Sequence, residues 1–179
     1  SQSFYQVNAT QTEVLYDEAI RLANLTGAET VIDAYCGTGT IGLVAARRGA
    51  ARVIGVDSVP SAIRDAANNA RHNGVENAEF VTQDATAFMK ELAASEERPQ
   101  PLVLLMDPPR AGSTPEFLEA ATSLAPERIV YISCNPATQA RDVRQLVESG
   151  YEVRAVRPVD MFPHTDHVES IVMLEKKND

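Results

Sequence analysis

Short apolar runs alternate with amphipathic stretches along most of the chain. The apolar runs lie at residues 30–34, 52–56, 78–81, 102–106 and 129–132, and their length and flanking turn residues are typical of buried strands. Segments with helical periodicity separate or follow them, at residues 41–48, 60–73, 86–94, 115–124 and 136–149. This alternation predicts an α/β fold with a mostly parallel sheet and helices on both of its faces.

The two ends of the chain depart from this alternation. Near the start, Thr10-Gln11-Thr12-Glu13 has the pattern of a capping box and predicts a helix that runs to about Leu25 and is ended by Gly27. Near the end, apolar segments at residues 152–156 and 168–174 are joined by about a dozen residues without a helix, which predicts an antiparallel hairpin at the edge of the sheet. We therefore expect a single domain, with an N-terminal segment and helix over residues 1–28 and a seven-stranded core over residues 29–179.

Composition and charge narrow the class of protein. Of the 179 residues, 44% are apolar and 23% charged, and no stretch reaches the roughly 18–20 apolar residues of a membrane span. The polar N-terminus has no signal-peptide pattern, and it begins with Ser1 rather than Met, which suggests a processed product or a domain from a longer protein. The net charge of −9 is unlike that of a stand-alone nucleic-acid-binding domain.

The chain has two cysteines, Cys36 and Cys134, which lie in different motifs and lack metal-ligand spacing. Without a disulfide framework or a secretion signal, a reducing cytoplasm is the expected location. The sequence also predicts no metal site.

Polar residues follow the predicted strands. Asp33, Asp57, Asp84, Asp107 and Cys134 all fall at or near the carboxyl ends of apolar runs. In an open parallel sheet these ends meet at one edge, where ligands bind. The sequence thus predicts a ligand site at that edge.

Cys134 lies within Tyr131-Ile132-Ser133-Cys134-Asn135-Pro136. Because proline is favoured at the first position of a helix, we expect the cysteine at or just before a helix N-terminus, whose partial positive charge favours a thiolate. A nucleophile needs this setting. Taken alone, the segment also fits a small buried residue at a strand end.

The glycine-rich turn Gly37-x-Gly39-x-x-Gly42, with Asp57 further on, satisfies a dinucleotide-binding pattern. Its glycines allow a ligand to approach the backbone at a helix N-terminus. Asp33 would repel a pyrophosphate but suits the cationic amino group of S-adenosylmethionine. Asp84 is placed to accept from an adenine amino group, and Asp57 suits ribose hydroxyls in either cofactor. The pattern favours S-adenosylmethionine and leaves NAD as the alternative.

Four motifs occur in a characteristic order. They are Asp33-Ala34-Tyr35-Cys36-Gly37-Thr38-Gly39-Thr40, Asp107-Pro108-Pro109-Arg110, Ser133-Cys134-Asn135-Pro136 and Phe162-Pro163-His164-Thr165-Asp166-His167-Val168-Glu169. Together they closely resemble the RNA (uracil-5-)-methyltransferase family, which makes 5-methyluridine in ribosomal or transfer RNA. The resemblance covers nearly the whole chain, from Phe4-Tyr5-Gln6 to the last strand. It implies a Rossmann-like class I methyltransferase fold that uses S-adenosylmethionine.

The resemblance also implies roles for individual residues. The family's cofactor contacts fall on Gln6, Tyr35, Thr40, Asp57, Asp84 and Asp107, beside the glycine loop of Gly37 and Gly39. Its nucleophile falls on Cys134 and its proton-abstracting base on Glu169. Some relatives carry Asn at position 40, and many carry Glu in place of Asp57; both differences are conservative.

The chemistry explains why a thiol and a carboxylate are needed. Addition of a thiolate at C6 of uracil makes C5 nucleophilic, and after methylation a base must remove the C5 proton before the cysteine can leave. Asp107 could accept from uracil N3–H or from the cofactor. Arg110 could stabilise enolate charge, contact phosphate or form a structural ion pair. Phe162 is a candidate to stack on the extruded base, and His164 to order its loop or contact RNA.

We expect the substrate to be 23S rRNA, with tRNA as the alternative. Relatives commonly carry an N-terminal RNA-binding domain, so we expect such a domain to supply RNA affinity. We also expect this chain to be monomeric. Three other functions stay open at this point. An amino-methyltransferase shares the Asp-Pro-Pro element but usually has an aromatic residue where Arg110 stands, and the remaining two are an NAD-dependent oxidoreductase and a non-catalytic RNA-binding domain.

Overall fold

A computed structural model describes residues 9–161 and 168–178 of the chain. In these residues seven strands form one sheet in the order β3-β2-β1-β4-β5-β7-β6. The strands are β1 (Thr30–Ala34), β2 (Arg52–Asp57), β3 (Ala78–Thr82), β4 (Leu102–Met106), β5 (Arg128–Ser133), β6 (Tyr151–Asp160) and β7 (Val168–Lys176). The first five pair in parallel, and β7 runs antiparallel to both β5 and β6. The predicted parallel sheet with an antiparallel edge hairpin is confirmed.

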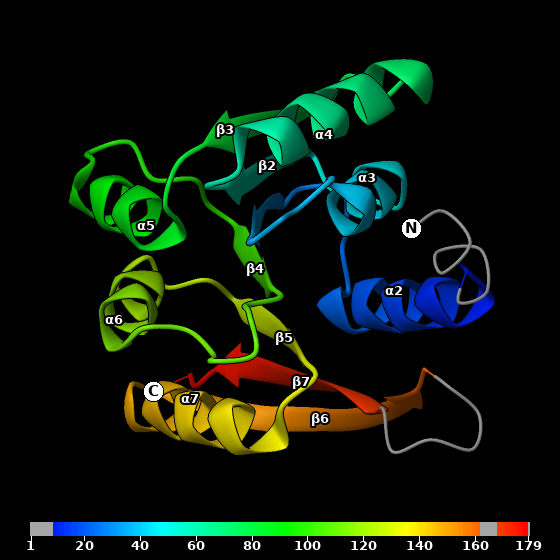
Figure 1. Cartoon of the computed structure of the whole chain (residues 1–179). Coiled ribbons are helices and arrows are strands. Elements are labelled where there is room, and N and C mark those ends of the chain that lie inside the picture. The colour runs from blue at the N-terminus through cyan, green and yellow to red at the C-terminus, as the bar shows by residue number, and fades with distance from the viewer. Residues whose placement is uncertain (1–8, 162–167, 179) are drawn as a thin grey trace.

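Six helices in the described residues cover the two faces of the sheet (Figure 1). They are α2 (Ala9–Ala23), α3 (Thr40–Arg47), α4 (Pro60–His72), α5 (Ala85–Ala94), α6 (Pro115–Ser123) and α7 (Pro136–Glu148). Helices α2 and α3 lie against one face, and α4 packs beside α3 on β2 and β3. Helices α5, α6 and α7 line up along the other face.

The hydrophobic core consists of two layers, one on each face of the sheet. Central strand β4 shows the division, because Val103 and Leu105 join the layer under α2 and α3, while Leu102, Leu104 and Met106 join the layer under α5, α6 and α7. All five side chains are buried. A strand covered on both faces is apolar at every position, which is why this run is continuous in the sequence.

The parallel register brings three strand ends to the same level. Ala34, the last residue of β1, pairs with Val56 of β2 and with Met106 of β4. The residues one position further along the chain, Tyr35, Asp57 and Asp107, therefore also lie at one level. The sheet itself thus gathers residues from distant parts of the sequence at one edge.

The N-terminal helix differs from its prediction at both ends. Helix α2 already includes Ala9, so Thr10 lies inside it and the predicted capping box is wrong. The helix stops at Ala23 because Asn24 adopts a left-handed conformation, with φ of 51°. Asparagine tolerates this conformation better than most residues, so the helix ends well before Gly27.

The last hairpin has longer strands than its sequence predicts. Strand β6 continues to Asp160, which leaves a shorter connection to β7 than the expected dozen residues. Its apolar pattern is interrupted by a register shift between Val153 and Ala155 and by Pro158, which an edge strand can accommodate.

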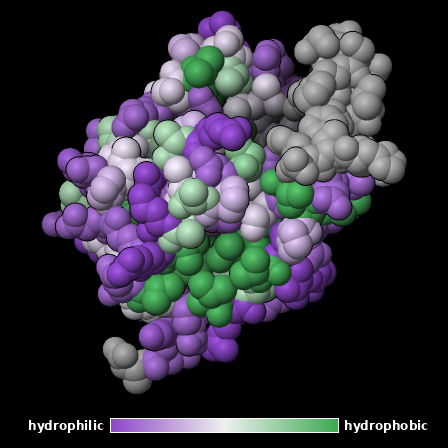
Figure 2. All heavy atoms as spheres, turned by 60° about the horizontal axis from the view of Figure 1, so that its bottom comes forward, coloured by the Kyte–Doolittle hydropathy of each residue, from purple (hydrophilic) through white to green (hydrophobic). Residues whose placement is uncertain are grey.

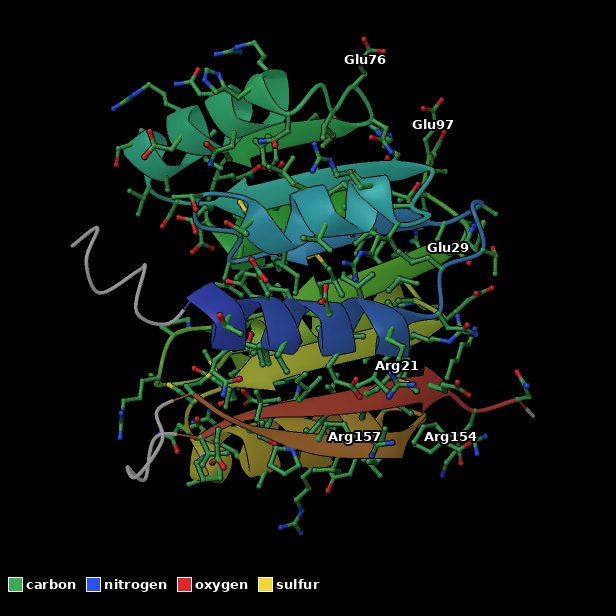
Figure 3. The ribbon with its side chains drawn as sticks, turned by 90° about the vertical axis from the view of Figure 1, so that its right-hand side faces the viewer. Arg21, Glu29, Glu76, Glu97, Arg154 and Arg157 are labelled. Atoms are coloured by element: carbon green, nitrogen blue, oxygen red, sulfur yellow. The ribbon has the colours of Figure 1, made fainter. Side chains whose placement is uncertain are left out.

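Ion pairs connect α2 to the hairpin on the face seen in Figure 3. Glu18 of α2 accepts hydrogen bonds from Arg21 at 3.0 and 2.5 Å, and Arg157 of β6 lies 3.5 Å from the same carboxylate. The Arg21 hydrogen bonds lower the pKa of Glu18 against the opposing effect of its partial burial. Such partly exposed pairs contribute little stability, so the apolar layer beneath α2 is the main contact.

The opposite side of the hairpin exposes apolar surface. Val153 and Val156 of β6 and Val147 of α7 are all exposed. Figure 2 shows a patch of apolar side chains on the side of the molecule that β6 and α7 form.

None of the helices in the described ranges is both long enough and apolar enough to cross a membrane.

Candidate active site

The glycine loop after β1 is shaped by its own backbone and by Asp57. Tyr35, Gly37 and Gly39 have φ values of 60°, 56° and 82°, a left-handed conformation that favours glycine. A Cβ at Gly39 would lie 2.8 Å from the ring of Phe80, so no larger residue fits there. The N–H of Gly37 donates to Oδ2 of Asp57 at 2.9 Å. This hydrogen bond holds the Asp57 carboxylate, predicted to bind ribose, directly beside the loop.

Asp33 lies under this loop, with its side chain toward α3. It is 1% exposed, and a Cβ at Gly42 of α3 would lie 2.8 Å from its Oδ2. That oxygen has no hydrogen-bond partner among the residues that the structure describes. Burial, with repulsion from Asp107 and Asp57, raises the pKa of Asp33 to about 8. A bound cation would stabilise the ionised form of this carboxyl group.

Asp107 follows the central strand, and its N–H donates to the carbonyl of Ala34 at 3.4 Å. The residue is exposed, yet protein atoms crowd its carboxyl group and partly withdraw it from water. This desolvation, with repulsion from the carboxylate of Glu169, raises the pKa of Asp107 to about 7. Asp107 and Glu169 are therefore close enough to influence each other, although 62 positions of sequence (169 − 107) separate them.

Cys134 lies at the helix N-terminus that the sequence predicts. Asn135 is the N-cap of α7, and its side chain accepts from the N–H groups of Ala137 and Thr138 at 3.1 and 3.4 Å. Pro136 is the first residue of the helix. Cys134 itself is half-buried and reduced.

The antiparallel register of β5 and β7 predicts that Cys134 lies near Glu169. Strand β5 pairs with β7 through Tyr131 with Val172, Ile132 with Ile171 and Ser133 with Ser170. Strand β5 ends at Ser133, and one further step of the same register would set Cys134 opposite Glu169. In antiparallel sheets, side chains of opposed residues lie on the same face, with Cβ atoms about 5 Å apart.

Side-chain alternation predicts that four of these residues share one face of the sheet. In a strand, residues two positions apart share a face. Counting two positions into each strand from Asp33, Asp107, Cys134 and Glu169 gives Val31, Leu105, Ile132 and Ile171, and all four belong to the core layer under α2 and α3. Asp33 and Glu169 lie within β1 and β7, and the same alternation predicts this face for Asp107 and Cys134, which directly follow β4 and β5.

Hydrogen bonds tie the loop after β4 to both neighbouring loops. The carbonyl of Arg110 accepts from the side chains of Asn135 at 3.1 Å and Thr138 at 3.0 Å. At its other end, Ser113 shares a hydrogen bond of 2.7 Å with the hydroxyl of Tyr35. Sequence reasoning missed Ser113, because its partner is 78 residues away and no local pattern announces the contact.

Tyr35 is therefore held by protein contacts on one side. Besides its bond to Ser113, its ring packs on Phe117 with centroids 5.4 Å apart, and burial raises the pKa of its hydroxyl. Its predicted contact with a cofactor stays a prediction.

Several other predicted residues have clear positions. Asp84 is exposed and caps α5 by accepting from the N–H of Ala87 at 2.9 Å. Thr40 is the first residue of α3. Arg110 is exposed on the loop after β4. Cys36 is buried, and burial raises the pKa of its thiol, which agrees with the packing role that its position in the turn predicts. Gln6, Phe162 and His164 lie outside the described residues.

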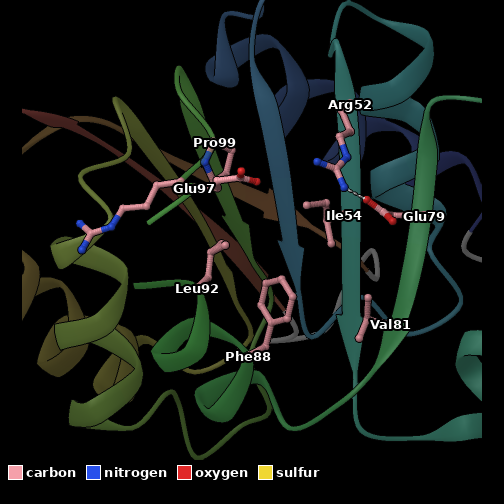
Figure 4. Close-up of a pocket in the computed structure, with 9 residues that line it drawn as sticks. Arg52, Ile54, Glu79, Val81, Phe88, Leu92, Glu97 and Pro99 are labelled. Atoms are coloured by element: carbon pink, nitrogen blue, oxygen red, sulfur yellow. Dashed lines mark hydrogen bonds and ion pairs between the residues drawn. The ribbon is translucent and has the colours of Figure 1, made fainter. Parts of the chain in front are cut away.

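Two cavities lie near these elements. One, of about 440 Å³, lies between α2 and α3 and is lined by Thr12, Glu13, Tyr16, Asp17, Thr40, Val44 and Arg48. The other, of about 450 Å³, lies between β2, β3 and α5 and is lined partly by Ile54, Val81, Phe88 and Leu92 (Figure 4). Arg52 and Glu79 form an ion pair at the edge of this cavity, and both lie near the amino ends of their strands, β2 and β3. This second cavity contains none of the predicted site residues and lies toward the amino ends of the strands.

The strand order and the site at the carboxyl edge define the class I fold of S-adenosylmethionine-dependent methyltransferases. The N-methyltransferase NodS of Bradyrhizobium japonicum, solved with S-adenosylhomocysteine, has this fold and superposes with a TM-score of 0.72 at 14% identity, covering 94% of this chain and 88% of that one. The model of the tRNA (uracil-5-)-methyltransferase family matches residues 1–177. The chain belongs to this family.

Individual relatives agree with this assignment. An uncharacterized RNA methyltransferase of Halalkalibacterium halodurans is 53% identical over 178 residues, which are 99% of this chain and 38% of that protein. The tRNA (uracil-54, C5)-methyltransferase of Pyrococcus abyssi, solved with S-adenosylhomocysteine, is 36% identical with a TM-score of 0.73, covering 88% of this chain and 37% of that one. The chain thus spans less than two fifths of the length of these relatives.

The described residues fit S-adenosylmethionine. The glycine loop leaves open space at Gly37, where a Cβ would meet nothing within 4 Å. The carboxylates of Asp57 and Asp84 match the hydroxyl and amino donors of an adenosine. The buried, unpartnered oxygen of Asp33 suits a cationic neighbour. A pyrophosphate would meet three carboxyl groups here, so these residues do not favour NAD.

The raised pKa of Asp33 leads to a test by protein stability. Its folded pKa, about 8, exceeds the unfolded value near 4, so the folded state binds the proton more tightly and the free energy of unfolding falls as pH rises from about 4 to about 8. Asp33→Asn removes this titration. We expect the stability of the variant relative to wild type to rise by roughly 5 kcal/mol across that range, measured by urea unfolding without cofactor. A difference that does not change with pH would contradict a buried, proton-binding Asp33.

Proposed function

We propose that this chain is the catalytic domain of an enzyme that methylates C5 of a uridine in RNA through a covalent bond between Cys134 and C6 of the base. The observation that carries the proposal is the β5–β7 register, which sets Cys134 opposite Glu169 when it is continued by one residue. A nucleophile and a base are needed on the same uracil, and the burial of Ile132 and Ile171 in one core layer supports a shared face for Cys134 and Glu169.

The cofactor would be held at the carboxyl ends of β1, β2 and β3. Its proposed contacts are Gln6, Tyr35, Gly37, Gly39, Thr40, Asp57, Asp84 and Asp107, with Asp33 beneath the loop. When bound, S-adenosylmethionine supplies an electrophilic methyl group for C5 of the uracil. Asp57 accepts from the ribose hydroxyls, and the cluster of carboxyl groups favours a cationic ligand.

Cys134 activates the base. Its sulfur forms a bond to C6, the C5–C6 double bond opens, and the electron pair moves toward C5 and O4 as an enolate. The N-terminus of α7, which begins at Pro136, adds a partial positive charge beside the sulfur. Asp107 accepts from N3–H of the uracil or from the cofactor, and exposed Arg110 stabilises negative charge on the base or contacts phosphate.

Glu169 completes the reaction by accepting the proton from methylated C5. The electron pair of that C–H bond re-forms the C5–C6 double bond, the C6–S bond breaks, and Cys134 leaves as a thiolate. Glu169 is half-buried and lies close to Asp107 at the same end of the sheet.

The RNA is the part of the function on which this chain carries least information. With a net charge of −9, we expect most RNA affinity to come from the rest of the full-length protein, including an N-terminal RNA-binding domain. We propose 23S rRNA as the substrate, with tRNA, the RNA named for the Pyrococcus abyssi relative, as the alternative. The target base must leave its stack to reach Cys134, and Phe162 and His164 are proposed to contact it or the adjoining RNA.

The nucleophile is tested by Cys134→Ala in the full-length protein. We expect methylation of RNA, measured by mass spectrometry of 5-methyluridine in rRNA and tRNA, to fall by roughly a thousandfold or more, because no other group can add to C6. Binding of S-adenosylhomocysteine, measured by calorimetry, should stay at the wild-type level. Substantial residual methylation would exclude covalent catalysis by this residue.

The base is tested by Glu169→Gln. An amide cannot accept the C5 proton, so turnover should fall by about 10²- to 10⁴-fold and the methylated adduct should persist. It would appear on denaturing gels as a protein–RNA species of reduced mobility. Normal turnover without such a species would remove Glu169 from this role.

A further inference from the structure

Helix α7 turns an unusually polar face toward the protein interior. Its buried residues are Gln139, Asp142 and Leu146, and the first two are only 4% and 2% exposed. Burying an amide or a carboxylate is unfavourable unless hydrogen bonds replace those lost to water. The contacts of Gln139 and Asp142 therefore indicate what these side chains do.

Gln139 bridges the two strands that carry the proposed nucleophile and base. Its Nε2 donates to the carbonyl of Tyr131 in β5 and to the carbonyl of Ser170 in β7, both at 3.1 Å. Ser170 adjoins Glu169 in the chain, and Tyr131 lies three residues before Cys134. One side chain thus bonds to both β5 and β7 at the end of this strand pair that carries Cys134 and Glu169.

Asp142, one turn further along α7, binds the loop after β4. Its Oδ2 accepts from the N–H of Ser113 at 2.8 Å and from the hydroxyl of Tyr131 at 2.6 Å. Its Oδ1 accepts from Arg141 at 3.0 and 3.1 Å, and Arg141 also donates to the carbonyls of Ala111 and Ser113 at 3.0 and 3.2 Å.

The loop is closely fitted to this arrangement. Gly112 has φ of 84°, and a Cβ there would lie 2.5 Å from Arg141 and 2.8 Å from Oδ2 of Asp142. Through Ser113, the same loop holds the hydroxyl of Tyr35 in the glycine loop. Asp142 therefore connects α7 with the two loops that carry the proposed cofactor and substrate contacts.

We propose that Gln139 and Asp142 are positioning residues that support different steps of the reaction. Gln139 sets the base strand relative to Cys134 and so supports proton removal from C5. Asp142 sets the loop of Asp107 and Arg110 and so supports formation of the adduct. Neither side chain touches the reacting atoms. This division rests on the function proposed above for Cys134 and Glu169.

The two supports can be weakened by mild substitutions with matched controls. Gln139→Leu removes the donors to both strands and keeps a similar size, and Gln145→Leu is its control, because Gln145 on the same helix donates to the carbonyl of Pro115 in α6 and to neither β5 nor β7. Tyr131→Phe removes the hydroxyl bond to Asp142. Tyr151→Phe is its control, since buried Tyr151 donates to the carbonyl of Pro126 at 2.5 Å.

Two RNA substrates separate the steps in the full-length protein supplied with S-adenosylmethionine. RNA containing 5-fluorouridine has fluorine in place of the C5 proton, so the adduct forms but no base can release it, and its rate of formation reports the steps before proton removal. RNA containing uridine reports complete turnover and the fraction of protein held as adduct. Urea unfolding of each variant reports any general loss of stability.

We expect Gln139→Leu to form the fluorouridine adduct at the wild-type rate, while turnover on uridine falls about tenfold and adduct accumulates, since a small displacement of a catalytic group has effects of this size or larger. Tyr131→Phe should slow adduct formation, without accumulation on uridine RNA. The two control variants should match wild type in both assays.

Equal slowing of both assays by Gln139→Leu, or no slowing by either substitution, would overturn the positioning roles. A wild-type protein that methylates uridine yet never forms the fluorouridine adduct would overturn the proposed covalent mechanism itself, and this proposal with it. The result for the wild-type protein therefore distinguishes failure of the positioning roles from failure of the covalent mechanism.

Discussion

The antiparallel pairing of β5 with β7 is the constraint on which the site depends. The paired residues run to Ser133 and Ser170, and the register continued by one step predicts that Cys134 and Glu169 lie opposite each other on one face of the sheet. A shift of this register by one residue would turn one side chain to the opposite face and separate the proposed nucleophile from its base. The amide of Gln139 bonds to carbonyls on both strands and opposes such a shift.

The parallel strands β1, β2 and β4 position the proposed cofactor contacts, again through the register of neighbouring strands. Equal registers bring Tyr35, Asp57 and Asp107 to one level, and Asp33 lies beneath them. Burial, together with repulsion among the carboxyl groups of Asp33, Asp57, Asp107 and Glu169, raises the pKa values of Asp33 and Asp107. A cationic ligand relieves this repulsion, so the cost of gathering these groups favours binding of a sulfonium cofactor with an amino group.

Much of this arrangement could be predicted from the sequence, for physical reasons. Strands β1 and β4 were predicted to the residue because they are short apolar runs bounded by turns. The candidate residues Asp57, Asp107 and Cys134 stand at the ends of β2, β4 and β5, which the same kind of run predicts. Edge strand β6 gave a weaker pattern because most of its residues are at least partly exposed and Pro158 interrupts it. The contacts of Gln139 with Ser170 and of Tyr35 with Ser113 join residues 31 and 78 positions apart, and only the folded chain brings them together.

The most direct test of the central claim is a crystal structure of the full-length protein with S-adenosylhomocysteine. The account predicts that the sulfur of Cys134 and the carboxyl group of Glu169 lie on the face covered by α2 and α3, with Cβ atoms about 5 Å apart, beside the bound ligand at Asp57. Cys134 and Glu169 on opposite faces of the sheet, or a ligand bound away from the carboxyl ends of β1 and β2, would contradict it.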